Sequence, residues 1–192
     1  LKARDDIDHW KAKTLDLSPI IMKPEVMPDD HPYQQMLQDH GLDKALDNRL
    51  IELAQPAIEN GQSVTETLEI KNGNRTVGAT LSGVIAKKTG EEGLPDGSIN
   101  FTFQGSAGQS FGAWLVSGVT FRVEGDANDY FGKGLSGGRL IITPPTDSPY
   151  EADENILIGN VALYGSTGGE VYVNGLACER FAVRNSAATA VV

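Results

Sequence analysis

The sequence predicts an all-β fold, a parallel β-helix (solenoid) whose coils of about 20 residues stack on one another. The first observation is the glycine content, 22 in 192 residues, which exceeds the usual share of about 7%. The second is the distribution of these glycines, since only Gly41 precedes residue 61. The third is that short β-prone runs follow residue 61, where no apolar period typical of helices continues.

Residues 1–40 are expected to form an extended arm or linker. Prolines at positions 19, 24, 28 and 32 forbid a continuous helix. The charged stretch 2–13 has a helical composition. The apolar run Ile20-Ile21-Met22 needs burial, either on the body of the fold or on another domain.

Residues 41–61 are expected to be a short helical segment. Its apolar residues recur at the spacing of one helix face, namely at Leu42, Leu46, Leu50, Leu53 and Ala54. Asp39 is the predicted N-cap, and Pro56 is expected to end the helical pattern before a short turn that stops at Asn60-Gly61.

Residues 62–192 are expected to form the β-helix, without long helices. Alternating or β-branched runs separated by turn signals predict its strands. These runs are 65–70, 99–103, 119–123, 139–142 and 170–173.

An internal repeat supports this prediction. Phe111-Gly112 and Gly118 recur 20 residues later as Phe131-Gly132 and Gly138. Further copies are weaker, and one is lengthened by the polar insert Pro145 to Asn155. A small residue at a fixed place in each coil permits a positive φ or a close approach of stacked backbones. The expected structural repeat positions are Gly78, Gly83, Gly105, Gly108, Gly112, Gly118, Gly125, Asn128, Gly132, Gly138, Gly165, Gly169, Gly175, Cys178 and Ala182.

Composition excludes several classes of protein. A formal net charge of −10 argues against nucleic acid or an anionic membrane as a partner. No run approaches the ~18 apolar residues that span a bilayer. The single cysteine, Cys178, excludes an internal disulfide framework. The sequence shows none of the patterns typical of helical repeats, leucine-rich repeats or a hexapeptide left-handed β-helix. We expect an intracellular, cytoplasmic fragment of a longer polypeptide.

Apparent chemical motifs have structural interpretations. Residues 132–137 spell G-x-G-x-x-G, but a β-prone run follows them instead of the helix that a dinucleotide site requires. His9, His31 and His40 show no metal-ligand spacing. Cys178 fits a small buried residue better than a nucleophile. We therefore predict no catalytic, cofactor-binding or metal-binding residue in this chain.

Several consecutive motifs resemble the C-terminal domain, named for its GXGXG repeats, of the glutamate synthase large (alpha) subunit. The resemblance covers nearly the whole chain. The motifs are 74–78, 109–113, 125–130, 132–138 and 179–186, together with the linker-like runs 14–18 and 38–42.

This resemblance implies a right-handed β-helix and a non-catalytic structural domain that packs against and positions the amidotransferase and FMN domains. The parent enzyme would be an oxidoreductase acting on CH–NH2 donors, which converts glutamine and 2-oxoglutarate to two glutamates. Its FMN and its 3Fe–4S cluster would lie in upstream domains. Its electrons would come from NADPH, through a small subunit, or from ferredoxin. Residues 1–40 would then be the linker from the flavin domain. The chain stops at Val191-Val192 within a coil, so the fragment is expected to associate through its exposed end.

Two alternatives remain open at this stage. One is the β-helix subunit of another redox complex, similar to formylmethanofuran dehydrogenase. The other is a β-helix carbohydrate-active enzyme that uses Asp126 and Asp129 as an acid pair. For the latter two residues, hydrogen bonding within a turn is the competing interpretation.

Overall fold

The computed structural model describes residues 6, 8–31 and 33–192, which divide into the units 1–40 and 41–192. The first unit contains two single-turn helices, α1 (Trp10–Lys13) and α2 (Ser18–Ile21), joined by irregular chain. Of the stretch predicted to be helical, only Trp10–Lys13 forms a helix among the described residues. Residues 2–5 and 7 of that stretch, and Pro32, lie outside the described residues.

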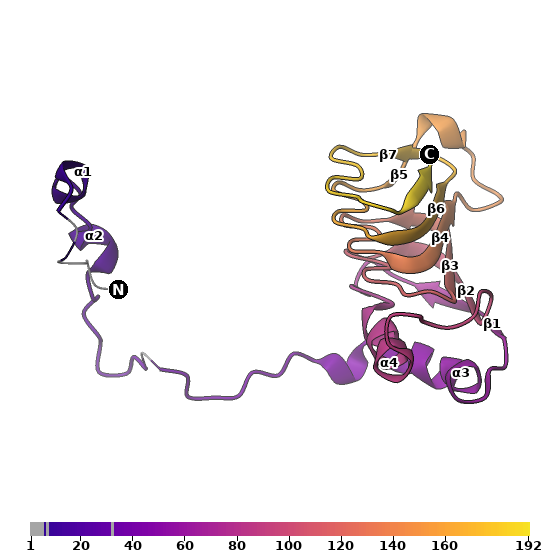
Figure 1. Cartoon of the computed structure of the whole chain (residues 1–192), viewed down its shortest axis with the longest axis horizontal. Coiled ribbons are helices and arrows are strands. Elements are labelled where there is room, and N and C mark those ends of the chain that lie inside the picture. Colours follow the sequence, from indigo (N-terminus) through magenta and orange to yellow (C-terminus); the bar gives the residue numbers. More distant parts are fainter. Residues whose placement is uncertain (1–5, 7, 32) are drawn as a thin grey trace. The chain divides into compact units, whose positions relative to one another are not determined.

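The second unit begins with helices. The 3-10 helix η1 (Leu42–Lys44) leads into α3 (Leu46–Asn60), and a further helix, α4 (Ala79–Thr89), follows the first strand. The strands are β1 (Val64–Ile70), β2 (Ile99–Ala107), β3 (Val119–Ala127), β4 (Ser136–Thr143), β5 (Ile156–Ile158), β6 (Gly168–Val173), β7 (Leu176–Ala177) and β8 (Thr189–Val191), with η2 (Ala152–Glu154) ahead of β5. Figure 1 shows the helices α3 and α4 at the β1 end of the stacked strands.

All eight strands belong to one parallel sheet. Its main order is β1-β2-β3-β4-β6-β8, and β5 pairs with β3 and β7. The fold is therefore mixed α/β, a parallel sheet flanked by helices, and the prediction of an all-β right-handed parallel β-helix is wrong.

The helix α4 lies where the sequence suggested a weak coil. Gly83 and the run Val84-Ile85-Ala86, interpreted as a glycine corner and a strand, lie within it. Residues 79–89 also contain good helix formers such as alanine, leucine and lysine. Because α4 joins β1 to its parallel neighbour β2, this part is a strand–helix–strand crossover.

The boundaries of α3 also differ from the prediction. The helix continues through Pro56 to Asn60, and Gly61 ends it with a left-handed φ of 67°. Pro56 has no backbone N–H and therefore removes one hydrogen-bond donor from the helix. The other backbone hydrogen bonds of the last turns suffice to continue the helix. The N-cap residues are Gly41 for η1 and Ala45 for α3, not Asp39.

Five strands contain the runs predicted from alternation, and their register is regular. Phe101 pairs with Phe121 and Phe103 with Val123, each 20 residues apart. We call one strand with its following turn a layer. Side chains at matching positions of successive layers lie above one another, so the inward rows build a stacked core. Its largest members are Phe101, Phe103, Phe111, Phe121 and Phe131, each at most 1% exposed.

A buried carboxylate joins the two main helices. Asp47 of α3 is 3% exposed. It accepts hydrogen bonds from the backbone N–H groups of Gly78 (2.7 Å), Thr80 (2.7 Å) and Leu81 (3.1 Å). These groups begin α4 and would otherwise have no partner within the helix. The negative charge also interacts favourably with the helix dipole.

We predict that Asp47→Ala lowers the free energy of unfolding by about 2–4 kcal/mol, because three N–H groups at the start of α4 lose a buried, charged acceptor. Asp47→Asn should cost less, since its amide oxygen still accepts. Urea denaturation followed by circular dichroism measures both changes. The control, Asp43→Ala at an exposed site, should change stability by less than about 0.5 kcal/mol. Equal effects of Asp47→Ala and Asp43→Ala would contradict the capping role.

Candidate functional site

The turns that follow the long strands share an unusual backbone. In the turn after β2, Ser110, Gly112 and Trp114 have φ values of 62°, 68° and 56°. Their N–H groups donate alternately to the layers on either side. Ser110 N bonds to the oxygen of Asp129 (2.8 Å) and Trp114 N to that of Lys133 (2.9 Å), whereas Gly112 N bonds to the oxygen of Val77 (2.9 Å). This turn is therefore hydrogen-bonded to both of its neighbours.

The pattern recurs in the later layers. Left-handed φ values occur at residues 130, 132 and 134, at 161, 163 and 165, and at 180, 182 and 184. Glycine occupies only some of these places, so a left-handed corner is tolerated here by tryptophan, tyrosine, valine, leucine and arginine. Sequence reasoning missed these non-glycine corners because only glycine signals a positive φ reliably.

The predicted repeat positions have several local environments. A positive φ is found at Gly78, Gly105, Gly112, Gly118, Gly132, Gly165, Gly169 and Ala182. A side chain at Gly108, Gly125, Gly138 or Gly175 would collide with a neighbouring segment, and Gly83 lies in α4 facing open space. Asn128 donates to the side-chain oxygen of Asn72 (2.9 Å), and the half-buried Cys178 donates its N–H to the oxygen of Ile158 (3.2 Å).

The G-x-G-x-x-G string forms one of these turns. Gly132 and Gly134 donate their N–H groups to Phe111 (2.9 Å) and Tyr164 (2.9 Å). Ser136 then begins β4, so no helix opens at the string. The N–H groups of residues 132–136, which a phosphate would need, already donate to adjacent layers or within the turn.

Asp126 and Asp129 have different surroundings. The Oδ1 atom of Asp129 accepts a hydrogen bond from the N–H of Asn160 (2.8 Å), which stabilises a turn. Asp126 is exposed and lines a groove of about 420 Å³ with Ser106 and Ile156. Asp129 does not line that groove.

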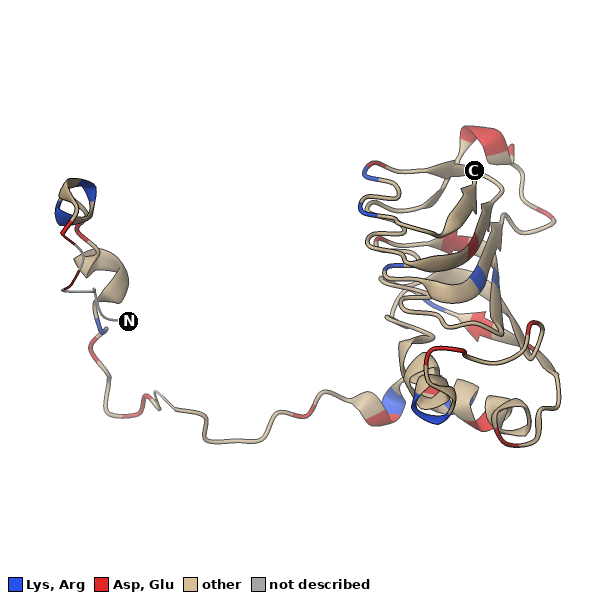
Figure 2. Cartoon of the chain, viewed as in Figure 1, with Lys and Arg blue, Asp and Glu red and all other residues tan. Residues whose placement is uncertain are grey.

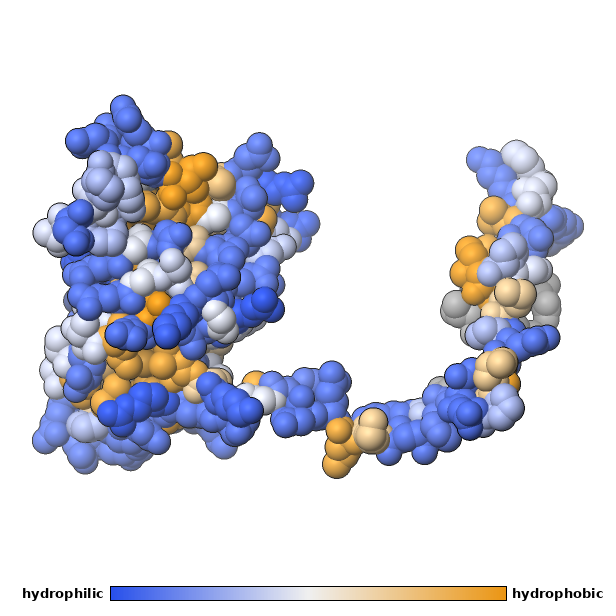
Figure 3. Space-filling view, turned by 180° about the vertical axis from the view of Figure 1, so that it is seen from behind, coloured by the Kyte–Doolittle hydropathy of each residue, from blue (hydrophilic) through white to orange (hydrophobic). Residues whose placement is uncertain are grey.

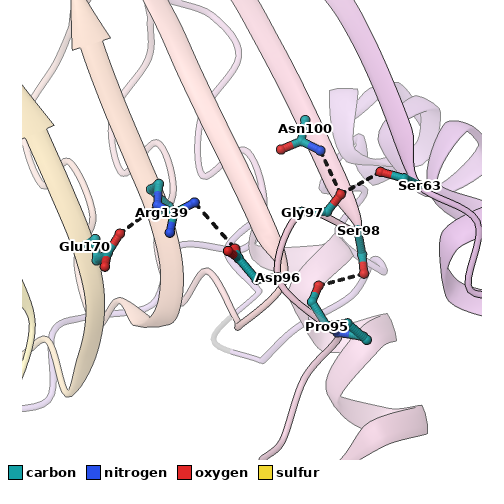
Figure 4. Close-up of polar contacts among 8 residues, drawn as sticks. All are labelled: Ser63, Pro95, Asp96, Gly97, Ser98, Asn100, Arg139 and Glu170. Atoms are coloured by element: carbon teal, nitrogen blue, oxygen red, sulfur yellow. Dashed lines mark hydrogen bonds and ion pairs between the residues drawn. The ribbon is translucent and has the colours of Figure 1, made fainter.

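The best-connected charged cluster was missed by sequence reasoning. Arg139 of β4 donates from Nε to Glu170 of β6 (2.6 Å) and lies 3.4 Å, through Nη1, from the carboxylate of Asp96 (Figure 4). The hydrogen bond to Glu170 raises the pKa of the Arg139 guanidinium above its usual value. Arg139 and Glu170 are direct neighbours in the sheet register, which a single sequence does not reveal.

This cluster fastens the connection between α4 and β2. Asp96 belongs to that connection, and Gly97 there accepts hydrogen bonds from Ser63 (2.6 Å) and Asn100 (2.8 Å), as Figure 4 shows. A groove of about 410 Å³ runs beside Arg139. Because these side chains are partly exposed, each ion pair contributes about 0–1 kcal/mol. The cluster can hold a loop in place.

Within the described residues 6, 8–31 and 33–192, no group of three or more histidine, cysteine or acidic residues could hold a metal ion. The three histidines lie in the first unit, where His9 accepts a hydrogen bond from the N–H of Lys11 through Nδ1 (3.3 Å). No described helix is long and apolar enough to cross a membrane.

The chain belongs to the GXGXG motif family, which it matches over residues 47–192. It is similar to glutamate synthase [NADH] of Schizosaccharomyces pombe, with 53% identity over the whole of this chain and 9% of the relative. It is 47% identical to the glutamate synthase [NADPH] large chain of Bacillus subtilis, over 96% of this chain and 12% of the relative. Ferredoxin-dependent glutamate synthase 2 of Synechocystis is 43% identical over the whole of this chain and 12% of the relative.

The chain thus spans only about a tenth of the length of these relatives. The resemblance to the GXGXG domain of glutamate synthase large subunits, inferred from the motifs, is confirmed.

The turns provide a matched test of close packing. Gly132 and Gly165 have φ values of 63° and 66°. A methyl group at Gly132 would lie 2.7 Å from Leu163 and 2.9 Å from Leu140, whereas one at Gly165 would meet open space. We predict that Gly165→Ala costs about 1 kcal/mol, the price of the left-handed backbone, and that Gly132→Ala costs about 1–3 kcal/mol more. Thermal unfolding measures both, and equal costs would show that packing at the corner is unimportant.

Proposed function

We propose that this chain is a non-catalytic structural domain of a glutamate synthase large subunit, which packs against and positions the amidotransferase and FMN domains. One observation supports this most. Relatives named for NADH, NADPH and ferredoxin all share the segment at 43–53% identity. A role common to all three is independent of the electron donor and therefore fits support of the shared machinery.

The proposal extends to the parent enzyme, a cytoplasmic oxidoreductase that converts glutamine and 2-oxoglutarate to two glutamates. FMN, the 3Fe–4S cluster and the site receiving electrons from NADPH or ferredoxin would lie outside this segment. Residues 1–40 would be the linker from the flavin domain, residues 41–61 a short helical segment, and residues 62–192 the body of the domain, with the repeat positions serving its architecture. A small subunit is a further proposed partner.

The isolated chain is predicted to show neither glutaminase activity nor 2-oxoglutarate-dependent glutamate formation above a buffer control. Ammonia release from glutamine and glutamate production, measured by coupled assays, test this. A complete glutamate synthase assayed in parallel is the positive control. Turnover by the purified chain that is lost on heat denaturation would overturn the non-catalytic assignment.

The end of the sheet opposite α3 and α4 offers a surface for self-association. Within residues 41–192, β8 has one neighbour, β6, and Val191 and Val192 are 55% and 56% exposed. The N–H groups of Arg180 and Arg184 have no backbone acceptor there, although their counterparts in earlier layers donate to the next layer. Figure 3 shows apolar surface near this end. An open strand edge beside apolar surface favours pairing with another chain.

We therefore predict concentration-dependent association of the isolated chain through this end. Sedimentation velocity from about 1 to 100 µM, a range suited to weak edge pairing, should show a growing faster-sedimenting species. Val191→Lys should reduce it, because a charge on an edge strand opposes pairing. Leu42→Lys, at an exposed apolar residue of η1, is the matched control and should leave association unchanged. A strict monomer throughout would refute the prediction.

A further inference from the structure

Trp114 is unusual in both backbone and surroundings. Its φ of 56° is disfavoured for a bulky side chain, and the indole is 48% exposed. The equivalent corners of the next two layers are Gly134 and Gly165. The indole lies against Gly134, since a Cβ atom there would be 2.6 Å from its Cδ1 and Nε1 atoms. The fold thus holds an exposed tryptophan at a corner where the next two layers have glycine.

A cation lies beside this indole. The Lys133 Nζ atom is 5.7 Å from the Trp114 ring centre and 5.3 Å from that of Tyr130. These contacts orient the ammonium group without neutralising its charge. Within residues 41–192, neither Lys133 nor Arg184 forms an ion pair, whereas Arg49, Lys88 and Arg139 each do.

Backbone hydrogen bonds place these residues along one edge of the stack. Trp114 N donates to Lys133, Gly134 N to Tyr164, and Gly165 N to Val183. Arg184, at the next corner, follows Val183 directly. Figure 2 shows basic residues recurring at the tips of the turns on this edge, with acidic residues among them. Lys133 and Arg184 are two layers apart, which corresponds to roughly 10 Å.

We propose that Trp114, Tyr130, Lys133 and Arg184 form a docking surface for an acidic polypeptide segment carried by the remainder of the large subunit. This inference rests on the proposed function. Tryptophan, tyrosine and arginine are enriched among the residues that dominate protein interfaces. The absence of a side chain at Gly165, which faces open space, lets a bound backbone approach the surface between Trp114 and Arg184. A segment in the extended polyproline II conformation places side chains three residues apart on the same side at roughly 9 Å, which matches the spacing of the two cations with a carboxylate for each.

The overall charge distinguishes this occupant from a nucleic acid. Aromatic and basic groups together can also bind single strands, but the chain carries a net charge of −10, which repels a long polyphosphate. A short acidic segment needs only the local cations. A second copy of this chain could offer the acidic insert with Asp147, Glu151, Asp153 and Glu154, so the experiments separate that occupant as well.

The surface is tested first on the isolated chain, with Trp10→Phe so that Trp114 is the only tryptophan. A hexapeptide of glutamate at low salt is the probe, and hexathymidylate is the nucleic-acid comparison of equal length. We expect the glutamate peptide to shift the Trp114 emission. Lys133→Gln with Arg184→Gln should raise the Kd about tenfold or more, and Lys71→Gln with Lys87→Gln, at exposed sites elsewhere, should not change it. No shift, an equal loss in the control pair, or tighter binding of hexathymidylate would overturn the proposal.

The occupant is tested in the complete large subunit by carbodiimide cross-linking, which joins an amine to a carboxylate in contact with it. Mass spectrometry should find Lys133 linked to an aspartate or glutamate outside this segment, and Lys133→Arg should abolish that product. Links only to the acidic insert, or none, would overturn the assignment. The two proposals fail separately, because catalysis by the isolated chain would refute the structural role without altering either binding result.

Discussion

The requirement that neighbouring layers match in length governs this fold. Parallel strands pair at a spacing of about 4.8 Å, and here the turns between them are hydrogen-bonded to adjacent layers as well. Strand and turn must therefore both keep register, which explains the 20-residue step from β2 to β3. The longer step from β4 to β6, in which Arg139 pairs with Glu170, is accommodated because the insert begins after β4 has ended and stops before β5 begins.

The same constraint explains the glycines and the core. Where two layers touch through backbone atoms, as at Gly125 above the oxygen of Gly105, no side chain fits. Where they touch through side chains, bulky residues must fit against one another, as the rings of Phe103 and Phe121 do at 5.0 Å between centres. Asp47 closes the helical end by bonding α3 to the start of α4. The glycine contacts, the packed aromatic rings and the Asp47 carboxylate each stabilise a different part of the stack of layers.

The strands and many glycine corners could be predicted from the sequence because alternation and small residues are local signals. The helix α4 could not, since the sequence around Gly83 and Ile85 resembles a β-prone run and the carboxylate that caps the helix lies 31 residues before Gly78. The ion pairs of Arg139 depend on a register between distant strands. The left-handed backbone conformation of Trp114 could not be predicted from the sequence either, because neighbouring layers impose it.

The hydrogen bonding of the turns has a consequence for recognition. Surface loops usually lose considerable conformational entropy when they bind a partner. Here the corner residues donate to adjacent layers as strand residues do, so the backbone beneath Trp114 and Lys133 is fixed before any encounter. A partner that contacts this edge would meet a preordered surface, and most of the energy of each new contact would go into affinity instead of into ordering the loop.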